Sequence, residues 1–215
     1  MSKNISNLHL DILDNKRRDL LEKLLLYTDN FVLGGGTALA IYLSHRRSFD
    51  FDFFSFEPIK KSLLEKISKN IEIKNLANDT TDELTFFTTD EIKVTFLYYP
   101  FKNHFKILET EKGLRVFDIK DIAVQKAYTI GRRGEYRDYF DLYTILNLDY
   151  ANLAEVVEIA KKVYGSIFDE KIFLQQLVYF DDLLNFDLIP ATSKELPSTD
   201  EVKNFFEKLV EDYLR

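Results

Sequence analysis

The chain of 215 residues has no cysteine and only three histidines. Without cysteine it can form neither disulfides nor thiolate metal sites. The histidines (His9, His45 and His104) show no pattern of a catalytic or metal-binding partner, so we expect them to be structural or surface residues. The opening residues, MSKNISNLHL, lack the apolar core of a signal peptide, and we therefore expect a cytoplasmic protein.

Long apolar runs and excess positive charge are also absent. The longest uncharged run, Asn30–Ser44, is shorter than the roughly 20 residues that cross a bilayer, so we expect no membrane partner. A net charge of −7 argues against non-specific coating of nucleic acid, which depends on many lysine and arginine contacts with phosphate. A hydrophobic content of 46% is ample for a buried core.

Hydrophobic periodicity predicts an α+β protein. We expect an α/β lobe over residues 1–117 and a helical lobe over 118–215. The predicted helices cover 8–27, 37–44 (capped by Thr37), a stretch beginning at the N-cap Asp118, and 138–146 beyond a break at Gly131 and Gly134. The predicted strands cover 31–33, 48–54, 71–76, 84–87 and 92–98, with 114–117 as a short edge strand.

The segment GGGTALAIYLSHRRSFDFDFF, residues 34–54, carries the clearest functional signals. A strand, a glycine turn and a helix start can bind phosphate, because free backbone N–H groups and the positive end of the helix point at the anion. Gly35 and Gly36 would allow close approach, and Thr37 would add a hydroxyl. The spacing matches neither a Walker loop nor a dinucleotide fingerprint. A plain tight turn would explain the glycines equally well.

Asp50 and Asp52 alternate with phenylalanines at the period of a strand. They would share one face about 6–7 Å apart, with Phe49, Phe51 and Phe53 on the other. Two such carboxylates suit Mg²⁺ or Mn²⁺ carrying substrate phosphates. The alternative is a strand with one solvated face.

The order of these features resembles the nucleotidyltransferases of the DNA polymerase-beta superfamily, and the full string resembles the AbiEii/AbiGii type. The resemblance implies a polymerase-beta-like lobe in which Gly35, Gly36 and Thr37 form the phosphate-binding turn. Its H-R-x-S-x-D-x-D element is matched by His45, Arg46, Ser48, Asp50 and Asp52. A second match, DIKDIAVQKAYTIGRRGEYRDYFDL, implies roles for Lys126, Asp138 and Asp141. Lys126 would neutralise triphosphate charge, while the aspartates would orient it or accept a proton.

One position departs from the superfamily pattern. A third carboxylate usually stands on a later strand, and Thr95 occupies that position in IKVTFLYY. Glu91 lies roughly 13 Å away along the strand, and Glu72 cannot be placed from sequence. The loss predicts a site with one metal, or a binding module without transfer activity.

We therefore expect a Mg²⁺-dependent enzyme that transfers a nucleoside monophosphate from an NTP to an acceptor hydroxyl. The resemblance implies a toxin-antitoxin or abortive-infection role with a cognate antitoxin, and RNA, especially the acceptor end of tRNA, as acceptor. The alternatives are a catalytically reduced nucleotide- or RNA-binding protein and a small-molecule nucleotidyltransferase. The cluster Arg46, Arg47, Lys126, Arg132, Arg133 and Arg137 favours an anionic acceptor if these residues share a face.

Overall fold

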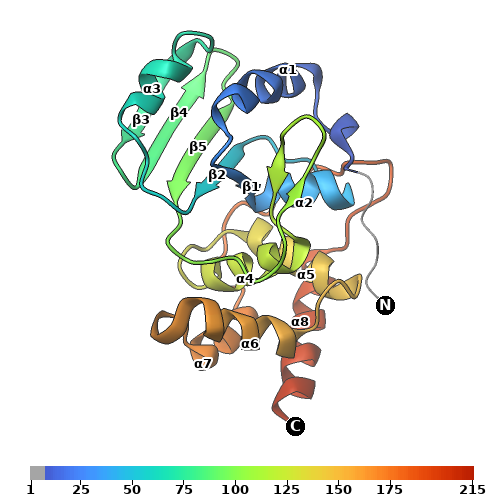
Figure 1. The fold of residues 1–215 in the computed structure, drawn as a ribbon. Coiled ribbons are helices and arrows are strands. Elements are labelled where there is room, and N and C mark those ends of the chain that lie inside the picture. The colour runs from blue at the N-terminus through green and yellow to red at the C-terminus, as the bar shows by residue number, and fades with distance from the viewer. Residues whose placement is uncertain (1–7) are drawn as a thin grey trace. The chain divides into compact units, whose positions relative to one another are not determined.

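A computed structural model describes residues 8–215, which form two compact units, 8–118 and 119–215 (Figure 1). The first unit contains a mixed sheet with helices, and the second is built from helices, so the predicted α+β class is confirmed.

The sheet of the first unit has seven strands in the order β3-β4-β5-β2-β1-β7-β6. β1 pairs antiparallel with β2 and parallel with β7, while β2 pairs parallel with β5. The strands are β1 (Val32–Gly34), β2 (Phe51–Ser55), β3 (Ile73–Asp79), β4 (Glu83–Thr88), β5 (Lys93–Tyr98), β6 (Leu108–Glu109) and β7 (Arg115–Val116). The helices are α1 (Asn15–Leu24), α2 (Gly35–Leu43) and α3 (Ser62–Ile67), with 3-10 turns η1 (Leu10–Ile12) and η2 (Leu25–Tyr27).

Aromatic side chains form the buried face of the central strands. Phe51 and Phe53 of β2 are buried, and Phe53 stacks on Phe96 of β5 with ring centroids 5.3 Å apart. This arrangement confirms the predicted alternation for these two residues. Phe49 differs from the prediction: it precedes the strand, is 39% exposed, and lies under the guanidinium of Arg17.

Two helix predictions were wrong in their boundaries. The expected helix over 8–27 is interrupted, because the chain turns extended at Leu13 and Asp14 caps a new helix by accepting from the backbone N–H of Arg17 at 2.9 Å. The helix after the glycines starts at Gly35 with Gly34 at the N-cap position, so Thr37 lies inside α2 and does not cap it. Three consecutive glycines concealed this earlier start.

The predicted edge strand over 114–117 is an interior strand. β7 lies between β1 and β6, through the pairing of Val116 with Leu33 on one side and Leu108 on the other. The true edge strand, β6, consists of two residues from a loop with no alternating pattern. The TTDE hairpin between β4 and β5 is confirmed by their antiparallel register.

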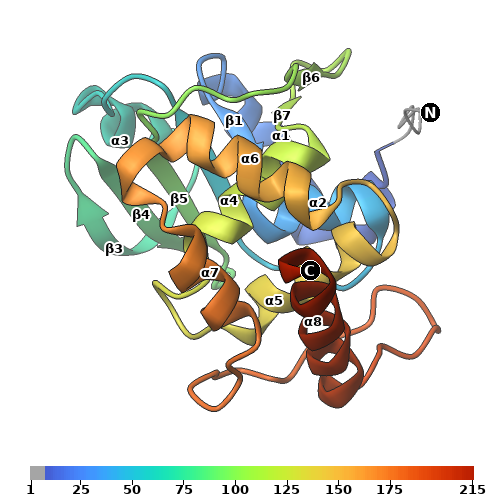
Figure 2. The same cartoon turned by 90° about the horizontal axis from the view of Figure 1, so that it is seen from below.

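The second unit contains five helices within the described residues, and Figure 2 shows α6 alongside α4 and α8 beside α5. The break at Gly131 and Gly134 is confirmed, since α4 ends at Thr129 and α5 begins at Tyr136. These helices are α4 (Ile119–Thr129), α5 (Tyr136–Asn147), α6 (Leu153–Tyr164), α7 (Glu170–Leu177) and α8 (Thr199–Leu214), with the turn η3 (Gly165–Ile167). None of the helices in 8–215 has the length and apolarity that a membrane span requires.

Candidate active site

The glycine turn of the first unit is built around the side chain of Asp52. Gly34, the last residue of β1, pairs with Asp52 in β2, and Gly35 follows with a φ of 64°. This left-handed conformation is strained for any residue with a Cβ. A Cβ at Gly35 would also stand only 2.8 Å from Oδ2 of Asp52. Both facts require glycine here, because the backbone must pass directly beside the carboxylate.

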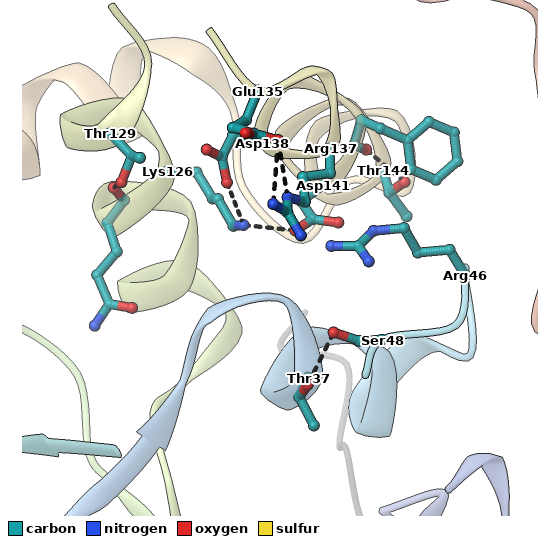
Figure 3. Close-up of polar contacts among 12 residues, drawn as sticks. Thr37, Arg46, Ser48, Lys126, Thr129, Glu135, Arg137, Asp138, Asp141 and Thr144 are labelled. Atoms are coloured by element: carbon teal, nitrogen blue, oxygen red, sulfur yellow. Dashed lines mark hydrogen bonds and ion pairs between the residues drawn. The ribbon is translucent and has the colours of Figure 1, made fainter. Parts of the chain in front are cut away.

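Hydroxyl groups join the start of α2 to the segment that leads into β2. Thr37 is buried, and its hydroxyl lies 2.8 Å from Oγ of Ser48 and also donates to the backbone carbonyl of Asp50 (Figure 3). A threonine hydroxyl has one proton to donate. In this structure, therefore, Thr37 positions the aspartate segment. Phosphate binding by Thr37 and Ser48 stays a prediction.

Arg46 and Arg47 differ sharply in exposure. Arg46 is 5% exposed, and its Nη1 donates to the carbonyl of Arg47 at 2.9 Å. Its guanidinium stands where a Cβ on Gly36 would be. Arg47 is exposed. Arg46 is therefore the arginine built into the glycine turn, on the side of Gly36 rather than that of Asp52.

Asp50 and Asp52 are both half-buried. Asp52 alternates with the buried Phe51 and Phe53 in β2, while Asp50 directly precedes the strand, so a shared face for the two aspartates stays a prediction. Oxygen ligands of this kind fit Mg²⁺ or Mn²⁺. Within residues 8–215, no group of three or more histidine, cysteine, aspartate or glutamate side chains gathers as a metal site. Asp50 and Asp52 stay the predicted metal ligands of the first unit.

The register shows what stands beside Asp52 on the neighbouring strand. Thr95 of β5 pairs directly with Asp52 of β2. Of the two other carboxylates considered from sequence, Glu91 lies in the hairpin turn and pairs with Lys74, while Glu72 is exposed ahead of β3. Glu83 was missed: it begins β4 and accepts a hydrogen bond from Thr85 at 2.6 Å.

A cavity of about 510 Å³ also lies in the first unit, but away from these carboxylates. It is lined by residues such as Phe31, Phe56 and Lys66, beyond the ends of β1 and β2 opposite to Gly34 and Asp52. The candidate site is defined by its side-chain chemistry, and this cavity is not part of it.

The second unit contains a buried ion network centred on Lys126 of α4. The ammonium lies 2.8 Å from Oδ1 of Asp138 and 2.6 Å from Oδ2 of Asp141, both on α5 (Figure 3). Lys126 is 4% exposed, and the two aspartates are fully buried. The spacing of three residues along α5 puts both carboxylates on one helical face toward the lysine. The structure thus brings together the three residues predicted in this unit.

Asp138 also binds the guanidinium of Arg133, whose Nε and Nη2 lie 2.7 Å and 3.0 Å from its two carboxylate oxygens. Burial alone would raise the pKa of Asp138. The charges of Lys126 and Arg133, with their hydrogen bonds, more than compensate and hold the pKa of Asp138 below its usual value. A carboxylate so stabilised is a weak proton acceptor, which favours orientation of Lys126 over general-base chemistry.

From the sequence, Arg133 was expected in a basic cluster or, as the alternative, in an ion-paired surface with Asp138 and Asp141, and the structure pairs it with Asp138. It lies in the loop between α4 and α5, where its position depends on a distant segment. Leu184 donates to the carbonyl of Gly134 at 2.7 Å and accepts from the N–H of Tyr136 at 3.1 Å. The sequence signal for this loop is the pair of glycines that flank the two arginines of GRRG. Arg137, by contrast, pairs with Glu135.

By family and by fold, the chain is of the nucleotidyltransferase class. A solved structure from H. pylori, of a protein assigned as a nucleotidyltransferase, shares this fold with a TM-score of 0.56 and 20% identity, covering 96% of each chain. The profile of the family "Nucleotidyl transferase AbiEii toxin, Type IV TA system" matches residues 19–213, and the chain belongs to this family. The uncharacterized protein aq_aa25 of Aquifex aeolicus (strain VF5) is 33% identical over 212 residues, covering 94% of this chain and 98% of the relative.

Proposed function

We propose that the protein transfers a nucleoside monophosphate from an NTP to an acceptor hydroxyl, releasing pyrophosphate. The observation that carries this proposal is the approach of the Gly35 backbone to the carboxylate of Asp52. It combines a phosphate-binding helix start with a metal-ligand pair in one unit, in a chain of the AbiEii family.

Asp50 and Asp52 would hold Mg²⁺ or Mn²⁺, whose chemistry at this position is to neutralise the phosphate oxygens. Gly35 and Gly36 would offer backbone N–H groups to the phosphates, and the helix start would favour their negative charge. Arg46, buried beside Gly36, would add a fixed positive charge.

Lys126 would supply positive charge for the triphosphate, with Asp138 and Asp141 holding its ammonium in place. Two buried carboxylates fix the direction of a flexible side chain and thereby remove the entropy cost of ordering it on binding. Orientation is the role that these contacts favour for Asp138.

RNA is the acceptor that we propose, with the acceptor end of tRNA as the first candidate. The family's description as a type IV toxin supports a toxin-like role beside a cognate antitoxin. An acceptor with a polyanionic backbone also suits the exposed cations Arg132 and Arg133 and the half-buried Arg137 around the start of α5.

Transfer can be tested with each labelled NTP, Mg²⁺ or Mn²⁺, and a total tRNA pool. We expect one NTP to label RNA with the wild type, and labelling to be lost with Asp50→Ala or Asp52→Ala. Glu91→Gln, in the exposed hairpin, is the matched control and should label normally. Equal labelling by the wild type and the aspartate variants would refute the assignment.

A catalytically reduced nucleotide-binding protein is the second candidate, favoured by Thr95 beside Asp52 where a third carboxylate would stand. Metal-dependent binding of NTP without transfer to RNA, and without transfer to small hydroxyl compounds, would support this candidate over the enzyme.

A further inference from the structure

The segment that leads into β2, residues 47–50, is held by side chains from the helices of its unit. It has no regular secondary structure and ends at Asp50. The carbonyl of Phe49 accepts a hydrogen bond from Nε of Arg17 on α1 at 3.0 Å. The carbonyl of Asp50 accepts one from the hydroxyl of Thr37 on α2. Two helices therefore contact the backbone on either side of the Asp50 side chain.

Arg17 contacts both the backbone and the ring of Phe49. Its guanidinium carbon lies 4.8 Å from the centroid of the ring, in addition to the bond from Nε to the carbonyl. Nη1 of the same guanidinium pairs with the carboxylate of Asp14, the N-cap of α1. The side chain of Arg17 is only 16% exposed. A planar group with several donors in a fixed arrangement can make all these contacts at once, and a single ammonium cannot.

The backbone contacts matter because nothing else holds the Asp50 side chain. Within residues 8–215, its half-buried carboxylate has no hydrogen-bond or ion-pair partner. The carbonyl of Phe49 shares a planar peptide unit with the nitrogen of Asp50, and the carbonyl of Asp50 belongs to the next unit. Fixing both carbonyls therefore fixes the backbone dihedrals of Asp50 and the direction in which its side chain leaves the chain.

Asp52 does not need such help, because it lies within β2 and is paired with Gly34 and Thr95 on the neighbouring strands. We infer that Arg17 is a positioning residue for Asp50: it orients the peptide unit before this aspartate, as Thr37 orients the one after it. Arg17 thereby sets where the Asp50 carboxylate stands relative to Asp52 and to a cation between them. This inference rests on the proposed function.

The sign of the expected effect separates positioning from charge. Arg17 is a cation, so its positive charge by itself opposes the binding of a metal ion nearby. If Arg17 acted only through its charge, Arg17→Gln would tighten metal binding. If it positions Asp50, the same substitution releases the carboxylate and weakens metal binding, because Mg²⁺ and Mn²⁺ require their oxygen ligands in a narrow geometry.

Binding of Mn²⁺ in the presence of a non-hydrolysable NTP analogue, measured by electron paramagnetic resonance of the free ion, tests the inference without turnover. We expect Arg17→Gln to weaken Mn²⁺ binding by about tenfold, as for other residues that orient metal ligands. Arg18→Gln is the matched control. It removes the same charge from the next residue of α1, where the exposed Arg18 bonds only to Asn15. This control should bind Mn²⁺ as tightly as the wild type, or slightly more tightly.

A second variant distinguishes positioning from a general loss of stability. Asp14→Ala removes the N-cap of α1 and the ion pair with Arg17 but leaves the contacts between Arg17 and Phe49 in place. We expect it to lower the urea midpoint at least as much as Arg17→Gln, because a helix cap is lost, while Mn²⁺ binding stays close to that of the wild type. If Mn²⁺ binding instead falls with the urea midpoint in both variants, Arg17 only stabilises α1 and the inference is overturned.

The outcomes also separate this inference from the proposed function. If Arg17→Gln binds Mn²⁺ like the wild type while Asp50→Asn does not, Arg17 has no positioning role and the proposed function stands. If the wild type itself binds no Mn²⁺ with the analogue, the proposed function falls and this inference falls with it.

Discussion

The two units hold their candidate functional groups by opposite means. In the first unit, half-buried aspartates are placed by the backbone: a left-handed glycine beside Asp52 and a threonine hydroxyl on the carbonyl of Asp50. In the second, a lysine is placed by charge, between two fully buried carboxylates. The first arrangement leaves the aspartates replaceable without unfolding, whereas the second makes function and stability inseparable.

The largest effect is expected when the charge at the centre of the second unit is removed. Lys126→Met would leave Asp138 and Asp141 buried without their shared cation, and should reduce the free energy of unfolding by about 3–5 kcal/mol. Urea denaturation measures this loss. Asp52→Asn should change the free energy of unfolding by less than about 1 kcal/mol, because Asp52 is only half-buried. Similar values for both variants would contradict the contrast between the units.

Loss of activity in a Lys126 variant is therefore ambiguous until its folding has been measured. A transfer assay of Lys126→Met requires the denaturation curve of the same sample beside it. This caution does not apply to the aspartates of the first unit, which makes them the better probes of the reaction.

A Cβ at the glycine turn should disturb the first unit through geometry alone. Gly35→Ala should cost about 1–2 kcal/mol for the left-handed backbone and should also displace Asp52, with loss of Mn²⁺ binding. Gly113→Ala is the matched control, because Gly113 also has a positive φ, 82°, but nothing lies within 4 Å of its Cβ position. Denaturation and Mn²⁺ binding together measure both effects. Retained Mn²⁺ binding in Gly35→Ala would show that close approach to Asp52 is not required.

The prediction from sequence succeeded where the signal was local. The glycine turn, the alternating aspartates and the paired Asp138 and Asp141 are each read from a few neighbouring residues. Thr37 was wrongly predicted to be a helix cap. Its hydroxyl donates instead to the carbonyl of Asp50, and this tertiary contact competes with capping. Glu83 was missed for a similar reason, since its neighbours are set by strand register.

A smaller effect is expected at the rim of the ion network. Arg133→Gln removes the paired hydrogen bonds to Asp138 and should cost about 1 kcal/mol, since such bonds contribute about 1.5–3 kcal/mol and exposure of the arginine reduces this. Arg137→Gln breaks only the pair with Glu135 and should cost no more than about 0.5 kcal/mol. Thermal or urea unfolding of the two variants provides the comparison. Equal losses of unfolding free energy in the two variants would mean that Lys126 alone stabilises the Asp138 carboxylate.

The smallest expected effect on the free energy of unfolding appears only at acidic pH. Because the folded-state pKa of Asp138 lies below the ordinary value of 3.8, the unfolded chain takes up this proton first. The stabilisation is complete above that value and is lost as the pH falls through the folded-state pKa. Unfolding free energies measured from about pH 6 to about pH 3 should therefore fall less steeply for Arg133→Gln, in which the pKa is lowered less. Parallel curves would argue against a contribution of Arg133 to this pKa.

The pairing of Leu33 with Val116 has a consequence for how the protein is made. β1, which ends in the glycine turn, gains its second neighbour only from the last strand of its unit. During synthesis from the N-terminus, the strand beside Asp52 therefore remains an unpaired edge until almost the whole unit has left the ribosome. Long-range pairing of this kind slows folding, so the aspartate site is completed late during synthesis of the chain.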